Sequence, residues 1–222
     1  MKQNRKTFFV VIVAAAVCCG IMALVDGVVR PGYAVKSAIK MAVFAALPLL
    51  LTRLFALLSP KEIIRFQKRG FGVALGLGIG IYALILGGWA VLRNWIDFSG
   101  IADSLTANAG VTKDNFLYVS LYISFANSLL EEFFFRGFLF GNLKQNRTLA
   151  YGISAAAFSL YHAAMMIGWF SPWLTALVLA GLFVGGLIFN WLNEKLGGIY
   201  ASWLTHMFAN FAINTIGFIL LK

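Results

Sequence analysis

Two adjacent acidic residues and an arginine lie in a stretch of the chain, 116–140, that is otherwise mostly apolar. An ionised side chain inside the hydrocarbon of a membrane costs about 2.5–3.5 kcal/mol on insertion scales, so such residues suggest a function. On a helix Glu132 and Arg136 are four residues apart, which is the favoured spacing for an ion pair. Glu131 points about 100° away from Glu132. We therefore expect Glu132 to be neutralised by Arg136, and Glu131 to remain as a carboxylate that can act as a base.

Both histidines of the chain lie in apolar segments as well. His162 follows Phe158 by one helical turn, so an aromatic ring is expected to pack beside its imidazole. His206 precedes Asn210 by the same interval, and these two side chains share one helix face. The sequence therefore offers an acid, two imidazoles and an amide on three separate apolar segments.

This set of side chains could hydrolyse an amide bond in two ways. In the first, Glu131 takes a proton from a water molecule that His162 holds, while His206 and the Asn210 amide donate hydrogen bonds to the oxyanion. In the second, Glu131, His162 and His206 bind a zinc ion that polarises the carbonyl group and supplies hydroxide. The chain has no His-Glu-x-x-His motif. A conventional zincin is therefore unsupported. We favour the reaction without a metal or other cofactor, because three ligands on separate helices would have to converge tightly, and we keep zinc as the alternative.

The composition indicates an integral membrane protein. Of the 222 residues, 61% are hydrophobic and only 12% are charged, whereas soluble domains carry about 25% charged residues. A disordered chain, a nucleic-acid-binding module and a secreted disulfide scaffold are excluded on this ground. The formal net charge of +10 is instead typical of cytoplasmic loops rich in Lys and Arg.

A helix that crosses a membrane needs about 20 mostly apolar residues. The predicted fold class is therefore all-α, a polytopic membrane helix bundle with about seven transmembrane helices. The second predicted span is the weakest, because Lys36, Lys40 and Arg53 lie in it; we expect them near its ends, where long side chains reach the headgroups. The predicted spans are Thr7–Val25, Ala34–Leu58, Phe71–Leu92, Phe116–Phe140, Leu149–Trp169, Trp173–Leu192 and Gly197–Leu221.

The basic residues predict the orientation. With the N-terminus in the cytoplasm, 12 of the 18 Lys and Arg residues fall on the cytoplasmic side and 6 on the outer side, as the positive-inside rule requires. The segment Lys61–Arg69 forms a basic cytoplasmic loop, and the longest outer loop is about Arg93–Asn115. This orientation places the acid and both histidines at similar depth, in the inner half of the membrane. We expect this membrane to be a bacterial plasma membrane. An alternative for the first segment is a signal peptide with Lys2–Lys6 as its basic region.

Three motifs in this order resemble the CPBP family (CaaX protease and bacteriocin-processing, also called Abi), which includes the type II CaaX prenyl endopeptidases. Glu-Glu-x-x-x-Arg stands at 131–136, Phe-x-x-x-His at 158–162 and His-x-x-x-Asn at 206–210. The resemblance covers about Phe116–Leu221. It predicts two parts: N-terminal transmembrane helices with a basic cytoplasmic loop at 1–115, and a catalytic core at 116–222. Four glycines fit the family's glycine-rich region: Gly181, Gly185, Gly197 and Gly198.

The resemblance implies an intramembrane endopeptidase that cuts a peptide or membrane-protein substrate in contact with the lipid bilayer, without nucleic acid. Glu131 would be the general base, His162 would position the water, and His206 with Asn210 would form the oxyanion site. Glu132, Arg136 and Phe158 would support them. Family members are often described as metalloproteases, and the glutamate–water mechanism is also proposed for them. The sequence does not indicate an oligomeric state.

Two other functions remain open on the sequence. The first is a bacteriocin immunity or membrane partner protein, either non-catalytic or dependent on protease activity. The second is a small proton-coupled transporter, because Glu and His inside a membrane also form proton relays; the lack of visible inverted repeats counts against it. A purely structural interpretation also exists, in which the glutamates pair with basic residues and the histidines join helices. Gly181 and Gly185 form a GxxxG pair, for which we expect helix packing.

Overall fold

The computed structural model describes residues 5–96, 106, 110–167 and 169–221, and every element within these ranges is a helix or a turn. The predicted all-α class is therefore confirmed for the described residues. Most of the predicted outer loop at 93–115 lies outside them.

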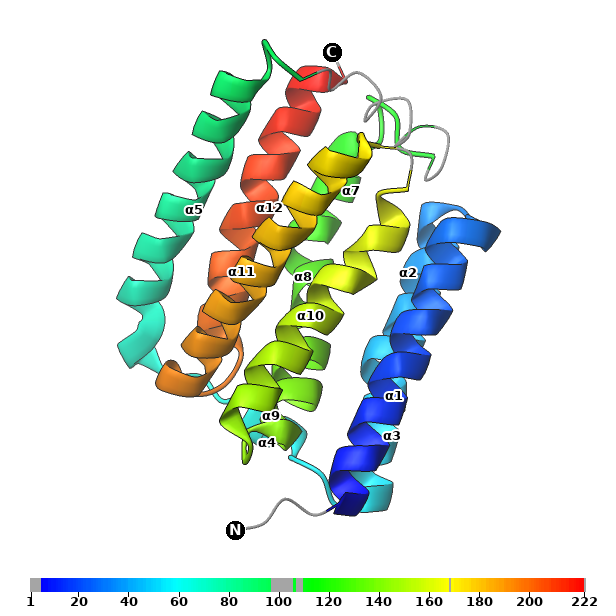
Figure 1. Cartoon of the computed structure of the whole chain (residues 1–222), viewed down its shortest axis with the longest axis vertical. Helices are drawn as coiled ribbons and strands as arrows, with labels where there is room; N and C mark the ends of the chain where they lie inside the picture. The colour runs from blue at the N-terminus through cyan, green and yellow to red at the C-terminus, as the bar shows by residue number, and fades with distance from the viewer. Residues whose placement is uncertain (1–4, 97–105, 107–109, 168, 222) are drawn as a thin grey trace.

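Long helical stretches run alternately up and down the bundle (Figure 1). The first begins at one end of the bundle, and the last ends at the other. Some stretches contain π-helical turns, labelled η1, η2, η4 and η5. In chain order the stretches are α1 and η1 (Arg5–Leu24, Val25–Val29); α2, η2 and α3 (Tyr33–Met41, Ala42–Ala46, Leu47–Phe55); α5 (Phe71–Leu92); α7, η4, α8, η5 and α9 (Phe116–Tyr122, Ile123–Asn127, Ser128–Glu131, Glu132–Phe140, Gly141–Leu143); α10 (Arg147–Met165); α11 (Pro172–Leu196); and α12 (Tyr200–Leu220).

Five of these stretches are long and apolar enough to cross a membrane: Arg5–Val29, Tyr33–Phe55, Phe71–Leu92, Pro172–Leu196 and Tyr200–Leu220. The stretches at 116–143 and 147–165 are not among the five. They carry Glu131, Glu132, Arg136 and His162, and such side chains lower the mean hydropathy of a helix. A bundle of several membrane-spanning helices is thus supported, while seven spans and a cytoplasmic N-terminus stay predictions.

An aromatic core anchors the helix that carries the acidic pair. Phe134, Phe135 and Phe138 lie within six residues after the glutamates, and all three are fully buried. Phe44 of η2 stacks on Phe134 with ring centroids 4.2 Å apart and meets Phe135 edge to face. Aromatic pairs of this kind contribute about 0.5–1.5 kcal/mol beyond their buried area. The run of phenylalanines therefore fixes the rotation of η5, and with it the directions of the preceding glutamates.

The same helix is widened by π-helical turns just before and after Glu131. Such turns are rare and frequently occur at functional sites. Two amides of α12 bind backbone carbonyl groups near the first of these turns: Asn210 Nδ2 donates to Ile123 O of η4 at 3.1 Å, and Asn214 Nδ2 donates to Ser120 O of α7 at 3.1 Å. These bonds set the register between α12 and the helix of the acidic pair.

The segment between α3 and α5 supports the start of α12. It contains α4 (Pro60–Ile63) and the 3-10 turn η3 (Lys68–Gly70). The backbone oxygen of the buried Ile63 accepts a hydrogen bond from the Ile199 N–H at 3.0 Å. Gly198 has φ +70°, and a Cβ there would lie 2.1 Å from Arg65 O. Only glycine fits this contact without strain, and the contact sets where α12 begins.

Replacing Gly198 by alanine is expected to lower the free energy of unfolding by about 1–3 kcal/mol, because a positive φ and a backbone clash coincide. Gly181→Ala is the control, since a Cβ there would meet nothing within 4 Å. Thermal unfolding of the two variants in detergent, followed by tryptophan fluorescence, measures the difference. Equal unfolding midpoints would show that the contact with Arg65 does not support α12.

The expectation that Gly181 and Gly185 pack closely against another helix is wrong within the described part of the chain. A Cβ on Gly181 or Gly185 would meet no atom within 4 Å. The neighbouring Gly186 packs instead, since its Cβ would lie 3.0 Å from Ala155 Cα. The close approach of α10 and α11 therefore uses the glycine one position after the motif.

Candidate active site

One oxygen of the Glu131 carboxylate is held by two donors from different helices. Lys40 Nζ of α2 lies 2.5 Å from Glu131 Oε1, and Asn127 Nδ2 donates to the same oxygen at 3.0 Å. Lys40 Nζ also donates to Asn127 Oδ1 at 2.5 Å. The three side chains thus form a closed triangle, in which Lys40 and Glu131 are 3% and 2% exposed.

The second oxygen of the same carboxylate has no hydrogen-bond partner among the described residues, although it is buried. It faces the Nε2 atoms of His162 at 3.8 Å and of His206 at 3.7 Å. Helices α8, α10 and α12 therefore bring the acid and both histidines together, as their predicted similar depth requires. Gaps of this length between polar atoms are commonly bridged by water.

The ring of His162 is oriented by the backbone of its own helix. His162 Nδ1 lies 2.7 Å from Phe158 O. A carbonyl oxygen only accepts, so Nδ1 carries a proton, and in the neutral ring Nε2 is an acceptor. The Phe158 ring meets the imidazole edge to face at 4.7 Å, in line with the spacing of the two residues. His162 therefore presents a lone pair toward Glu131.

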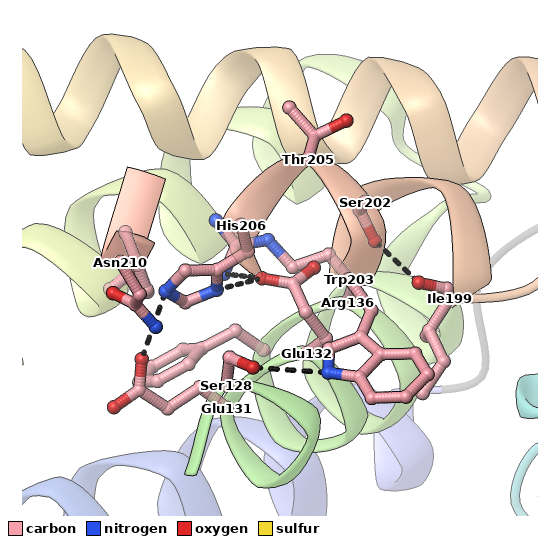
Figure 2. Close-up of polar contacts among 12 residues, drawn as sticks. Ser128, Glu131, Glu132, Arg136, Ile199, Ser202, Trp203, Thr205, His206 and Asn210 are labelled. Atoms are coloured by element: carbon pink, nitrogen blue, oxygen red, sulfur yellow. Dashed lines mark hydrogen bonds and ion pairs between the residues drawn. The ribbon is translucent and has the colours of Figure 1, made fainter. Parts of the chain in front are cut away.

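Glu132 joins an arginine and a histidine. Its Oε1 lies 3.2 Å from Arg136 Nη1 and 2.9 Å from His206 Nδ1. The ion pair with Arg136 has the spacing expected from the sequence. Figure 2 shows His206 between the two glutamates, with Nδ1 toward Glu132 and Nε2 toward Glu131. The second glutamate of the motif thus orients a histidine as well as pairing with the arginine.

Aromatic rings enclose the buried guanidinium of Arg136. Its Cζ lies 4.1 Å from the ring centroid of Phe158 and 4.9 Å from that of Phe189. Phe189 also stacks on His206, with centroids 5.1 Å apart. A cation over an aromatic face is attracted by the ring. Phe189 is a site residue that the sequence did not single out, since it lies in no motif.

Asn210 lies one helical turn after His206, and one N–H of its amide is committed to the backbone of η4. An asparagine amide carries a second N–H. The predicted oxyanion role depends on that second group. The structure therefore assigns Asn210 a packing contact in addition to any role in the reaction.

Lys40 is the site residue that the sequence interpretation placed wrongly. We expected it near a span end with its ammonium at the headgroups. Instead it is buried beside Glu131, with Nζ 5.0 Å from the Tyr161 ring centroid. A buried carboxylate offers the ammonium stronger interactions than a distant headgroup does. Glu131, which we expected to remain as a carboxylate beside the Glu132–Arg136 pair, therefore has a cation of its own at one of its two oxygens.

The side chains that could bind zinc do not fit a metal as they are arranged. No group of three or more His, Cys, Asp or Glu residues forms a candidate metal site in the described ranges. The ammonium of Lys40 lies 2.5 Å from the carboxylate that would have to bind the ion. Two like charges so close together would repel each other strongly. Lys40 thus already supplies the positive charge that a metal would bring.

Comparison with known proteins gives one family match. Residues 113–212 match the family described as Rce1-like, type II CAAX prenyl endopeptidase Rce1-like. No curated protein and no solved structure matches the chain. The matched segment contains all three motifs and the side chains of the site apart from Lys40. Residues 113–212 therefore carry the signature of the Rce1-like type II CAAX prenyl endopeptidase family, which confirms the resemblance found in the three motifs.

Proposed function

We propose that this protein is an intramembrane endopeptidase in which Glu131 activates water to attack a peptide bond. The observation that carries the proposal is the unpartnered Glu131 Oε2 facing two imidazole nitrogens at 3.7 and 3.8 Å. The match of residues 113–212 to a family of endopeptidases supports the reaction class.

The chemistry of the facing atoms favours water as the molecule between Glu131 and His162. Glu131 Oε2 and His162 Nε2 are both acceptors when the ring is neutral. Water can donate to both at once. The carboxylate then removes one proton as the oxygen attacks the carbonyl carbon, a role that contributes about 10²–10⁴-fold to the rate. Glu131 later returns this proton to the leaving amine as the C–N bond breaks.

His206 is suited to stabilise the oxyanion that forms. Its Nδ1 lies 2.9 Å from Glu132 Oε1, which fixes the direction of Nε2, and a ring that carries a proton on both nitrogens donates from Nε2. The remaining N–H of Asn210 is the second donor. Donors already in place when the charge develops can contribute about 10²–10³-fold each.

The substrate we propose is a peptide or a segment of a membrane protein that reaches the site from the cytoplasmic side, in the inner half of a bacterial plasma membrane. A site buried among helices favours a chain that is already held in the bilayer.

Terminal sequencing of membrane-associated peptides tests this function. Cells that produce the parent protein are compared with cells that produce Glu131→Gln at equal levels. We expect new peptide ends that depend on Glu131. Identical sets of termini would contradict the proposal.

We also propose that the reaction needs no metal. The parent protein, purified and dialysed against a chelator, is expected to keep its activity on an internally quenched CAAX-type peptide within about twofold, because Lys40 already neutralises Glu131. Elemental analysis of the same sample provides the control for metal removal. A loss of activity that zinc restores would overturn this prediction.

A further inference from the structure

We propose that Lys40 is a positioning residue of the active site, contributed by α2 from outside the segment that matches the family. By binding one oxygen of Glu131, it directs the other oxygen toward the histidines. This inference rests on the proposed function of Glu131 as the base, and it concerns a residue that none of the three motifs contains.

The geometry distinguishes the two carboxylate oxygens sharply. Oε1 takes hydrogen bonds from Lys40 and from Asn127, whereas Oε2 takes none from the described side chains or backbone. The two donors belong to different elements, and each also contacts the other. A planar carboxylate held at one oxygen by two mutually bonded donors cannot rotate freely. Its second oxygen therefore keeps its direction toward Nε2 of His162 and of His206.

The charges of the site lead to the same conclusion. Glu131 and Glu132 are adjacent and both buried, and Arg136 pairs with Glu132. A second buried carboxylate without its own cation would be strongly unfavourable. Lys40 supplies that cation and keeps Glu131 ionised, which is the form that can accept a proton from water.

Two lysines of α2 pair with buried carboxylates, and aromatic rings pack around the second of them. One turn earlier on the helix, Lys36 forms an ion pair with the buried Asp26 of η1. On the other side, the ammonium of Lys40 lies 5.5 Å from the ring centroid of Phe44 and 5.0 Å from that of Tyr161. The hairpin of α1 and α2 therefore places the Lys40 ammonium beside the Glu131 carboxylate.

Steady-state kinetics of Lys40→Met test the inference, with Lys36→Met as the matched control. Both changes remove a lysine of α2 that pairs with a buried carboxylate of another helix. Only Lys40, however, contacts Glu131. The substrate is an internally quenched CAAX-type peptide, or a peptide that spans a bond found by terminal sequencing. We expect Lys40→Met to lower kcat at least tenfold with KM within about twofold, and Lys36→Met to leave kcat within about twofold.

Thermal unfolding of Lys40→Met and Lys36→Met shows whether a lower kcat comes from a less stable fold or from a misplaced Glu131 carboxylate. A kcat for Lys40→Met within twofold of the parent would overturn the inference, as would equal losses of kcat in both variants. If Lys40→Met does not fold, Lys40→Gln replaces it, because its amide still offers a donor to the buried carboxylate. The same tenfold loss is expected there, because the glutamine amide carries no positive charge to pair with Glu131, and full kcat would again overturn the inference. Activity that survives Glu131→Gln would instead refute the proposed function itself, so the two failures are distinguishable.

Discussion

Glu131→Gln is expected to lower kcat by about 10²–10⁴-fold, the range that a positioned general base contributes. The amide has nearly the same size as the carboxylate and can still accept a hydrogen bond from Lys40, but it cannot take a proton from water. The measurement is the rate of cleavage of the quenched peptide by purified variant and parent in the same detergent.

Glu194→Gln is the matched control for this change. Glu194 is a glutamate of α11 that accepts hydrogen bonds from Arg147 and Tyr151 at the surface. The Glu194→Gln variant is therefore expected to have the same kcat as the parent. Equal unfolding midpoints for Glu131→Gln and the parent would show that the lower kcat comes from the missing base and not from a less stable fold. Retention of more than a tenth of the parent kcat by Glu131→Gln would contradict its role as the base.

Arg136→Met is expected to lower the free energy of unfolding by about 3–5 kcal/mol, the cost of leaving one partner of a buried ion pair alone. Arg136 is fully buried, and its removal leaves the carboxylate of Glu132 without its guanidinium. The rings of Phe158 and Phe189 would also lose the cation between them. Unfolding in detergent, followed by tryptophan fluorescence, measures this change.

Arg147→Met provides the comparison for a surface pair. Arg147 also pairs with a glutamate, Glu194, but its side chain is 66% exposed, and exposed pairs contribute little to stability. A double variant, Arg136→Met with Glu132→Gln, is expected to recover part of the lost stability, because no unpaired charge then remains. Equal stability of Arg136→Met and Arg147→Met would contradict the buried cluster described here.

Helix boundaries follow closely from the apolar pattern. The predicted span Phe71–Leu92 coincides with α5, and Phe116–Phe140 differs from the observed stretch by three residues at its end. The predicted and observed boundaries of both helices agree because a helix is ended by charged and turn-forming residues that lie at its own ends in the sequence. The number of spans does not follow in the same way, since the helices that carry the polar side chains are less apolar than the rest.

The cluster of Glu131, His162 and His206 could be proposed from sequence because each residue is ionisable and lies where ionisable residues are costly. Lys40 meets the same criterion. It was instead assigned to the headgroups, since a long side chain can reach them from near a helix end. Its actual partner is 91 residues away along the chain, and only the packing of α2 against α8 reveals that contact.

Other site features depend on tertiary structure alone. Phe189 lies among many apolar residues of α11, and nothing in its spacing distinguishes it from those that face outward. The bond between Asn210 and Ile123 O depends on a π-helical turn, which side-chain pattern does not predict. The same holds for Gly186, whose close contact depends on the rotation of α11 against α10.

Mass spectrometry of a peptide treated with purified, metal-depleted protein in proteoliposomes tests most directly whether Glu131 activates the attacking water. The parent protein and Glu131→Gln are compared at equal amounts. We expect the parent to cut the peptide at one bond without added metal, while the variant leaves it intact. Cleavage by both proteins, or cleavage by the parent only after zinc is added, would contradict the claim that Glu131 itself activates the attacking water.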